Sequence, residues 1–242
     1  MAPASITVVI PTWCEARSIA YSVRSALAVG DDVIVADASS PDGTAAVAQA
    51  AGARVVTAPR SRGAQLHAGA VAARGDVLLF LHADTLLPSQ ARAAIHEALD
   101  DSAVVGGNFY LQFVPRSFAA RLFTGVNDLR RRWLGIYYGD SGLFVRRSVY
   151  ERLGGFRALP ILEDYEFVRR LERSGPTVYL RQIVIEASAR RFETSPVRTL
   201  VVWTLIQTLY SVFQVSPRRL AKFYSDTHVV PRLVQEKPYE AR

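Results

Sequence analysis

The sequence predicts an α/β protein built as a single domain, with a mostly parallel central sheet that helices cover on both faces. Three observations carry this prediction. Short runs of β-branched and other apolar residues recur along the first third of the chain. Segments with helical spacing separate these runs, and Gly, Pro and Asp lie at the junctions. Strands that alternate with helices in this way form right-handed βαβ units, which give a parallel sheet.

The first part of the chain supplies four such strands. Pro11 ends a β-branched run, and residues 77–81 form an apolar run with no polar break. A strand of this kind is buried on both faces, as the inner strands of a parallel sheet are. The strands are expected at 6–10, 33–36, 54–57 and 77–81, and the helices at 15–29, in the alanine-rich stretch that ends at Gly52, and at 63–73.

After residue 100 the regular alternation stops, although further elements are recognisable. We expect strands at 104–114, 142–145 and 177–185, and helices at 117–134, 147–153 and 163–174. No change of composition marks a linker, and no internal repeat occurs. Residues 1–242 are therefore expected to form one domain with two functional halves.

Residues 197–215, VRTLVVWTLIQTLYSVFQV, approach a membrane span in length and apolarity. Arg198, Gln207 and several hydroxyl groups interrupt the stretch, which disfavours a span. Two interpretations stay open. The segment is either a helix that packs on the protein core or a helix that lies in the membrane interface.

Composition and charge narrow the class of protein. Cys14 is the single cysteine, which excludes an internal disulfide and a zinc site made of several cysteines. Since no secretory leader opens the chain, we expect a reducing, cytoplasmic setting.

Residues 1–115 carry a net charge of −3, whereas residues 116–242 carry a net charge of +10. Almost all of the basic residues in the second part are arginines. Arginine suits phosphate and carboxylate, which favours an anionic ligand or an anionic membrane surface; a solvated basic face is the alternative. No known nucleic-acid-binding signature occurs, so no nucleic-acid partner is expected.

The loop after the first strand, Pro11-Thr12-Trp13-Cys14-Glu15, contains no glycine. Dinucleotide-binding and P-loop folds need glycines at this turn so that the backbone approaches phosphate, which argues against a dehydrogenase and an ATPase. Asp37 ends the second strand, where its carboxylate would accept hydrogen bonds from a base or ribose, with Thr12 and Trp13 beside that base. Alternatively, Asp37 only starts the turn that Asp42 and Gly43 complete.

The fourth strand delivers His82-Ala83-Asp84 at its carboxyl end, where open parallel sheets bind ligands. The order of four motifs resembles that of family 2 glycosyltransferases of the GT-A fold, over roughly residues 5–225. These motifs are ITVVIPTWCE, VIVADASSPDGT, SRGAQLHAGAVAARGDVLLFLHADT and ILEDYEFVRRL. Three later segments resemble a compact bacterial subgroup associated with radical-SAM and selenium-domain proteins. They are YYGDSGLFVRRSVYERLGGF, ASARRF and VSPRRLAKFY.

The resemblance implies transfer of a sugar, with inversion, from a UDP- or GDP-linked nucleotide-sugar to an acceptor hydroxyl. A Rossmann-like half of about residues 1–115 would bind the donor, and about residues 116–195 the acceptor. Residues from about 196 to 242 would form C-terminal helices, peripheral to the inner face of the cell membrane. The donor-binding residues implied are Pro11, Thr12, Trp13, Glu15, Asp37, Arg62, His82, Ala83, Asp84, Arg190 and Arg191.

The resemblance also implies a metal ion. Family members usually carry Asp-x-Asp where this chain has His82-Ala83-Asp84, and that motif holds Mg²⁺ or Mn²⁺ against the donor diphosphate. We expect Asp84 to bind the metal, His82 to contact the donor or the metal shell, and His228 to complete that shell. Imidazole suits Mn²⁺ better than Mg²⁺. Taken alone, His82 is equally explained as a hydrogen-bonded structural histidine.

The catalytic carboxylates implied are Glu163 and Asp164, which open a helix. Asp164 would act as the general base on the acceptor hydroxyl, and Glu163 would orient the acceptor or cap the helix. The alternative for both is stabilisation of the helix N-terminus. The resemblance places acceptor contacts at Asp140, Ser141 and Gly142, and contacts with the leaving diphosphate at Arg190, Arg191 and Arg62.

Two other classes remain open at this point. A nucleotidyltransferase shares the parallel sheet and the acidic metal site, but commonly carries a glycine-rich loop after the first strand, which this chain lacks. A non-catalytic protein that binds a nucleotide-sugar or a membrane lipid would explain the histidine at position 82. The sequence leaves the acceptor open, whether lipid, glycan or small molecule, and fixes neither the donor's base nor its sugar.

Overall fold

The computed structural model describes residues 3–189 and 196–227 of the chain. Within these ranges the strands form one eight-stranded sheet in the order β3-β2-β1-β4-β7-β6-β8-β5. The first four strands pair in parallel, with β1 between β2 and β4. They are β1 (Ile6–Thr12), β2 (Asp32–Asp37), β3 (Arg54–Thr57) and β4 (Val77–Phe80). The predicted βαβ sheet is thus confirmed, with each strand close to its expected position.

The second half of the sheet is mixed. It contains β5 (Thr85–Leu86), β6 (Gly106–Val114), β7 (Leu143–Arg146) and β8 (Thr177–Ser188). Strand β7 runs antiparallel to both β4 and β6, whereas β6 and β8 are parallel. The two-residue strand β5, which the sequence analysis did not foresee, pairs antiparallel with β8. The sheet therefore remains mostly parallel, as predicted. Its antiparallel pairs all involve β5 or β7.

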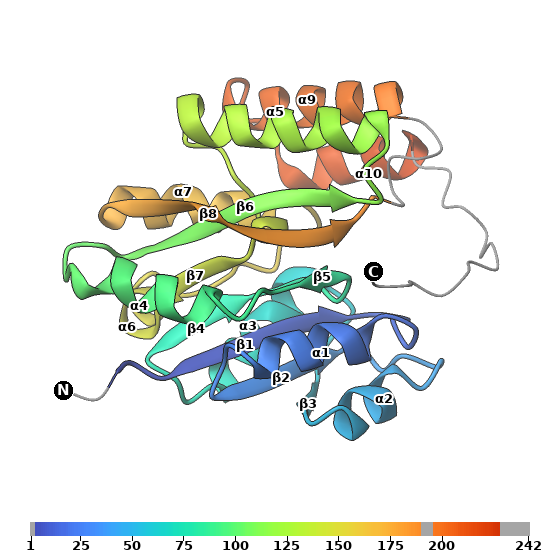
Figure 1. Ribbon diagram of the computed structural model, residues 1–242. Coiled ribbons are helices and arrows are strands. Elements are labelled where there is room, and N and C mark those ends of the chain that lie inside the picture. Colours follow the sequence, from blue (N-terminus) through green and yellow to red (C-terminus); the bar gives the residue numbers. More distant parts are fainter. Residues whose placement is uncertain (1–2, 190–195, 228–242) are drawn as a thin grey trace.

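Helices cover both faces of this sheet (Figure 1). One face carries α1 (Ile19–Leu27), α2 (Thr44–Ala50), α4 (Ala91–Asp100) and α5 (Phe118–Leu134). The other face carries α3 (Arg62–Ala72), α6 (Arg147–Arg152) and α7 (Glu163–Ser174). Successive strand residues point to opposite faces, so Val8 packs in the first core cluster and Val9 in the second.

Strand β4 is the buried strand that its apolar run predicts. Its side chains are at most 1% exposed, with Leu78 and Phe80 in one core cluster and Leu79 in the other. Water is therefore excluded from both faces of the strand. The polar residues His82 and Asp84 follow at its carboxyl end, beside the carboxyl ends of β1 and β2.

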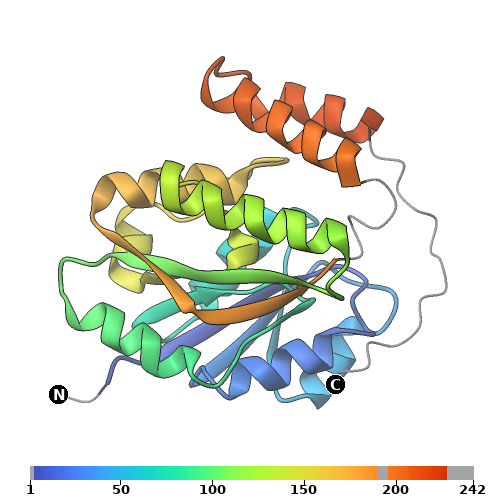
Figure 2. The same ribbon diagram turned by 45° about the horizontal axis from the view of Figure 1, so that its top comes forward.

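Two C-terminal helices, α9 (Pro196–Ser211) and α10 (Pro217–Thr227), lie at the same end of the molecule as α5 (Figures 1 and 2). The inner face of α9 packs on the protein, where Ile206 and Gln207 are buried, and its outer face is exposed. The core-packing interpretation of residues 197–215 therefore holds for one face of the helix. Within residues 3–189 and 196–227, none of the helices has the length and apolarity to cross a bilayer.

Candidate active site

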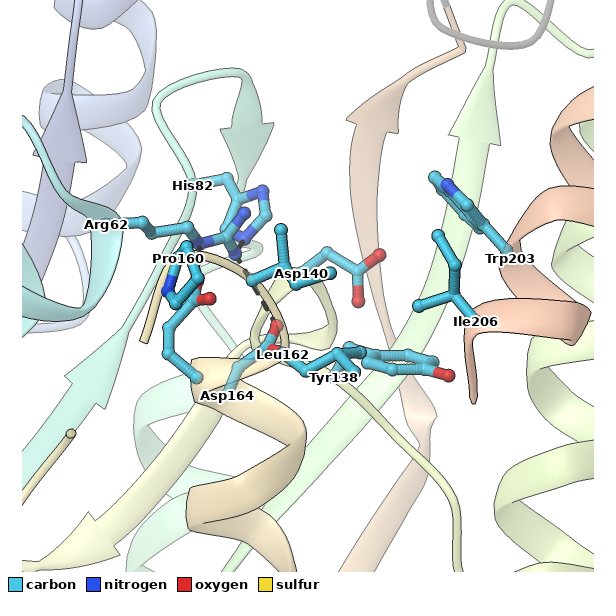
Figure 3. Close-up of a pocket in the computed structure, with 11 residues that line it drawn as sticks. Arg62, His82, Tyr138, Asp140, Pro160, Leu162, Asp164, Trp203 and Ile206 are labelled. Atoms are coloured by element: carbon cyan, nitrogen blue, oxygen red, sulfur yellow. Dashed lines mark hydrogen bonds and ion pairs between the residues drawn. The ribbon is translucent and has the colours of Figure 1, made fainter. Parts of the chain in front are cut away.

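A cavity of about 250 Å³ lies at the carboxyl edge of the sheet, next to the loop that follows β4 (Figure 3). Separate segments of the chain line it: the start of α3, the loop after β4, the turn η1 (Gly139–Ser141), the start of α7, and α9. The fold brings five of the predicted site residues together here. They are Arg62, His82, Asp140, Glu163 and Asp164.

Arg62 is the central cation of this cavity. Its Nε lies 3.1 Å from Oε1 of Glu163, and its Nη2 lies 3.8 Å from Oδ2 of Asp164. The contact between Nε and Oε1 is an ion pair that lacks the alignment of a hydrogen bond. The guanidinium also makes a hydrogen bond to Nε2 of His82. One arginine therefore links the loop after β4 to the start of α7.

The charges in this cluster shift two pKa values. Burial and the charge of Asp164 raise the pKa of Glu163 to about 7, although Arg62 opposes the shift. Burial lowers the pKa of Arg62, but Glu163, Asp164, Asp140 and Asp84 outweigh it and raise that pKa overall. Arg62 therefore stays charged, and Glu163 can gain or lose a proton near neutral pH.

Backbone groups hold the carboxylate of Asp164. The N–H of Gly139 donates to Oδ2 at 2.9 Å, and the N–H of Tyr165 donates to Oδ1 at 2.7 Å. Hydrogen bonds to a charged acceptor are stronger than neutral ones, so this carboxylate has a fixed orientation. Asp164 is thereby positioned at the cavity wall, as Figure 3 shows.

The chain enters α7 through a strained residue. Leu162 has a φ of 62°, in the left-handed region that costs a residue with a Cβ energy. This turn lets Glu163 and Asp164 open the helix at the cavity, where the helix dipole favours their charge. Gly63 in α3 packs against the same loop, because a Cβ there would lie 2.5 Å from the carbonyl oxygen of Arg157. The helix-terminus explanation accounts for the two carboxylates at the start of α7. It does not account for the positive φ of Leu162, and strained residues of this kind cluster at functional sites.

The carboxyl ends of β1 and β2 form a second polar cluster. Thr12 donates to Oδ1 of Asp37 at 2.8 Å, and Ser40 donates to both carboxylate oxygens, through its N–H at 2.7 Å and its hydroxyl at 2.6 Å. Gln65 of α3 ties the two strands together by donating to the carbonyl oxygens of Thr12 and Ala36. Asp37 is 3% exposed, so the turn interpretation accounts for its contacts within the chain. Its donor-binding role stays a prediction.

The loop after β1 presents an aromatic surface at this edge. The guanidinium of Arg60 lies 3.8 Å from the ring centroid of Trp13, a cation–π contact that the sequence analysis did not foresee. The N–H of Glu15 donates to the hydroxyl of Thr44 at 2.9 Å, which fixes the loop against α2. Pro11 still belongs to β1, so the loop turns only after Thr12.

Other predicted residues lie elsewhere. Ser141 is buried and bonds to Asn108 and to the carbonyl oxygen of Tyr138 rather than lining the cavity. Gly142 abuts the ring of Phe109. Ala83 is buried, and its carbonyl oxygen accepts a hydrogen bond from Ser22. Three more residues lie outside the described ranges: Arg190, Arg191 and His228.

The sequence analysis missed the wall opposite Arg62. Tyr138, Trp203 and Ile206 form it, and the two α9 residues face Arg62 and His82 across the cavity (Figure 3). The hydroxyl of Tyr138 donates to Gln207, which fastens α9 to the site. Trp203 and Ile206 are three residues apart and so share one helix face. This spacing could have predicted a shared face. It did not stand out in the sequence, because apolar residues occur on every side of the helix.

The charges around the cavity fit a divalent cation. Four carboxylates raise the pKa of Arg62: those of Glu163, Asp164, Asp140 and Asp84. In the described part of the chain, however, no three His, Cys, Asp or Glu side chains lie close enough to hold an ion unaided. Mg²⁺ and its relatives are often held by one or two carboxylates plus substrate phosphates and water. Asp84 is one of the carboxylates that act on Arg62, and its role as a metal ligand stays a prediction.

The mixed sheet with this acidic site at its carboxyl edge is the GT-A architecture of nucleotide-sugar glycosyltransferases. The mannosyltransferase PcManGT of Pyrobaculum calidifontis, solved with GDP-Man and Mn²⁺, superposes with a TM-score of 0.65 at 19% identity, over 95% of this chain and 71% of that one. Glucosyl-3-phosphoglycerate synthase of Mycobacterium tuberculosis, solved with Mn²⁺, UDP-Glc and phosphoglyceric acid, gives 0.60 at 19% identity, over 86% and 79%. At these identities the likeness shows the fold, and it confirms the GT-A prediction.

Residues 7–154 match the model of the family "Glycosyl transferase family 2", and the chain belongs to that family. Uncharacterized glycosyltransferases of Mycobacterium tuberculosis and Mycobacterium bovis are 39% identical to it over 135 residues, 54% of this chain. The match spans 62% of the length of these relatives. The predicted family is therefore confirmed, whereas the narrower bacterial subgroup stays a prediction.

Proposed function

We propose that the protein is an inverting glycosyltransferase that moves a sugar from a UDP- or GDP-linked donor to an acceptor hydroxyl. The observation that carries this proposal is the cavity at the carboxyl end of β4, where Arg62 meets Asp140, Glu163 and Asp164. A nucleotide-sugar has an anionic diphosphate beside a reactive anomeric carbon. The cavity offers the guanidinium of Arg62 as a cation for the diphosphate, and it offers carboxylates for chemistry at the anomeric carbon.

The donor would lie along the carboxyl ends of β1, β2 and β4. Its nucleoside part would occupy the edge formed by Thr12, Trp13 and Asp37, where Arg60 stacks on the indole ring. Its diphosphate would then reach Arg62 and Asp84. The solved neighbours that contain UDP-Glc or GDP-Man support this class of donor by their fold.

Asp84 would hold the metal ion, because it follows the buried strand β4 and belongs to the acidic set around Arg62. When bound there, Mg²⁺ or Mn²⁺ would neutralise charge on the diphosphate. Both neighbours named above contain Mn²⁺. His82, whose Nε2 pairs with Arg62, is assigned here to the donor side rather than to the metal.

Asp164 would act as the general base. Its oriented carboxylate would accept the proton of the acceptor hydroxyl while that oxygen attacks the anomeric carbon. The bond from the anomeric carbon to the diphosphate oxygen breaks on the opposite side, so the configuration inverts and the nucleoside diphosphate leaves. Arg62 would pair with the charge on the departing diphosphate, together with Arg190 and Arg191. Tyr138, Trp203 and Ile206 would form the apolar wall against which the acceptor lies.

Calorimetric titration tests this proposal. UDP-sugars, GDP-sugars and other nucleotide-sugars are titrated into the protein with and without Mn²⁺. We expect one donor class to bind, and Mn²⁺ to tighten that binding. Asp84→Ala should remove the metal-dependent part of the affinity and nearly abolish transfer, because the diphosphate charge is then not neutralised.

Asp76→Asn is the matched control for Asp84→Ala. Asp76 directly precedes β4, at the opposite end of the strand, and bonds to Ser5. This variant should bind the donor as the wild type does. If Asp84→Ala binds the donor with wild-type affinity in Mn²⁺ and keeps its turnover, the metal assignment is wrong. A protein that binds donors but transfers no sugar would instead be the non-catalytic binder.

A further inference from the structure

Helix α5 carries an apolar stripe on its outer side. Phe118, Leu122, Leu129 and Trp133 are between 39% and 85% exposed. Their spacing of four, seven and four residues places them on one side of the helix. The opposite side packs on the sheet, where Phe123 is buried in the core. The stripe therefore has no role in the core of the described chain.

Helix α9 carries a second stripe. Val197, Val201, Leu205 and Val212, just past the helix end, are between 41% and 71% exposed. Within residues 197–212, exposed charge on this side is confined to Arg198, near the start. A helix that is apolar on all sides is normally buried on all sides. The inner face of α9 is covered by the protein, but its outer face is not.

The two stripes lie on neighbouring helices. Nη2 of Arg130 in α5 donates to the hydroxyl of Thr204 in α9 at 2.9 Å. The rings of Phe123 and Trp203 pack edge to face with centroids 6.0 Å apart. Figures 1 and 2 show both helices at the same end of the molecule. We name this surface, defined by the eight residues of the two stripes, the α5–α9 face. Exposed apolar side chains gathered on two neighbouring helices favour a binding site for a protein or a membrane.

Basic residues border the α5–α9 face. Arg121 and Arg132 flank the stripe on α5, and Arg218 and Arg219 are exposed on the adjoining α10. Residues 196–222 contain no Asp or Glu. On α5, Asp128 is paired with Arg181 and with the hydroxyl of Tyr179, and its Oδ2 also lies 3.9 Å from Nη1 of Arg132. Exposed arginines therefore border this apolar surface on α5 and α10.

We propose that the α5–α9 face docks the protein on an anionic lipid bilayer, as a peripheral contact. Phe, Trp, Leu and Val would enter the boundary between headgroups and acyl chains, and the arginines would reach the anionic headgroups. A second copy of the chain fits less well, because it would bring one basic border against another. This proposal does not depend on the proposed catalytic activity, since docking needs none of the residues of the cavity's polar end.

Vesicle flotation with the full chain tests the docking. One set of vesicles contains phosphatidylcholine alone, and the other contains phosphatidylcholine mixed with phosphatidylglycerol. We expect the protein to float with the anionic vesicles at low salt and to be released in part at physiological salt, because salt screens the arginines. Floating with neither kind of vesicle at low salt would overturn the proposal.

Two variants and a control assign the binding to this face. Trp133→Glu combined with Val201→Glu should lower the vesicle-bound fraction about tenfold or more, because two apolar anchors are replaced by charge. Val71→Glu is the control, since Val71 is equally exposed but lies on α3. It should bind as the wild type does. Circular dichroism checks that each variant is folded.

Sedimentation velocity separates lipid from a second copy. We expect a monomer whose behaviour the double variant leaves unchanged. A dimer that Trp133→Glu with Val201→Glu dissociates would assign the face to self-association and overturn the proposal. Wild-type vesicle binding by the double variant would overturn it as well, because the docking surface would then lie elsewhere.

Discussion

Asp164 and Glu163 are adjacent in the sequence and share Arg62 as an ion-pair partner, yet different groups orient their carboxylates. Two backbone N–H groups orient Asp164, whereas Glu163 pairs with Arg62 and has its pKa raised to about 7, chiefly by burial. A general base must be oriented toward the proton that it accepts, and geometry precedes pKa in that choice. We therefore retain Asp164 as the base and Glu163 as the residue that would orient the acceptor, with Arg62 paired to it.

Asp164→Asn should separate catalysis from donor binding. The amide keeps the size of the side chain but does not accept the proton, so turnover should fall by roughly 10²–10⁴-fold. Donor affinity should stay within a few-fold of wild type, since the base acts mainly in the transition state. Glu163→Gln should affect turnover less and raise the acceptor KM. Initial rates with the donor found by titration, together with calorimetry, measure both effects.

Glu166→Gln provides the control for that experiment. Glu166 lies in the same first turn of α7 but pairs with Arg170 and Arg157, outside the residues that line the cavity. Its variant should keep turnover even where it loses some stability. Near-normal turnover in Asp164→Asn would refute the base assignment. Unfolding of Asp164→Asn, with Glu166→Gln still folded, would favour the helix-terminus explanation.

The sequence predicted the polar residues of the site around Arg62, but it missed the apolar wall that lies opposite them. Arg62 and Asp164 lie in two of the four motifs whose order carried the prediction, and Asp140 lies in a later segment; the three meet in one cavity. Trp203 lies in a segment whose apolar residues occur on every side of the helix, so the local pattern did not distinguish its inner face from its outer one. Contacts between distant segments, such as that of Tyr138 with Gln207, depend on tertiary packing and leave no local signal.

Helix α3 illustrates how an element is positioned. It packs on β1 so closely that a Cβ at Gly69 would lie 2.3 Å from Cγ1 of Val9. The same helix begins at Arg62 and supplies Gln65, which ties β1 to β2. The close approach of α3 to the sheet therefore sets the position of Arg62 in the cavity.

Gly69→Ala should lower the free energy of unfolding by about 1–3 kcal/mol, because the added methyl group overpacks the contact with Val9. Gly125→Ala is the matched control within α5, where a Cβ would meet no heavy atom within 4 Å. That change should instead stabilise the protein, by up to about 1 kcal/mol, through helix propensity. Urea unfolding followed by circular dichroism measures both. Equal effects of the two changes would show that the α3–β1 contact tolerates a methyl group.

Regular elements were predicted better than irregular ones. The parallel strands follow from β-branched runs, and α5 and α7 from helical spacing and from their charged residues. Helix α4 escaped the analysis although Ala91, Ala94, Ile95 and Leu99 carry helical spacing. Strand β5 has two residues, and a pattern of period two is not detectable over that length. The antiparallel direction of β7 depends on its neighbours β4 and β6, not on its own residues.

The whole molecule is built around one sheet, and its first core cluster crosses the boundary between the two predicted halves. That cluster contains Ile10 and Leu79 from the donor half together with Phe144 and Ile185 from the acceptor half. Strand β4 of the first half pairs directly with β7 of the second. Neither half therefore has a core of its own, which supports the prediction of a single domain.

We therefore expect the chain to unfold in one cooperative transition. Two tryptophans report on opposite parts of the molecule: Trp13 follows β1, and Trp203 on α9 packs against Phe123. Variants that keep only Trp13 (Trp133→Phe with Trp203→Phe) or only Trp203 (Trp13→Phe with Trp133→Phe) are unfolded in urea and followed by fluorescence. Coincident midpoints, equal to that seen by circular dichroism, are the expected result, because probes agree when no intermediate is populated. A lower midpoint for Trp203 would mean that α9 leaves the protein before the sheet unfolds. The wall opposite Arg62 would then belong to a separate cooperative unit, and the single-domain prediction would fail for the C-terminal helices.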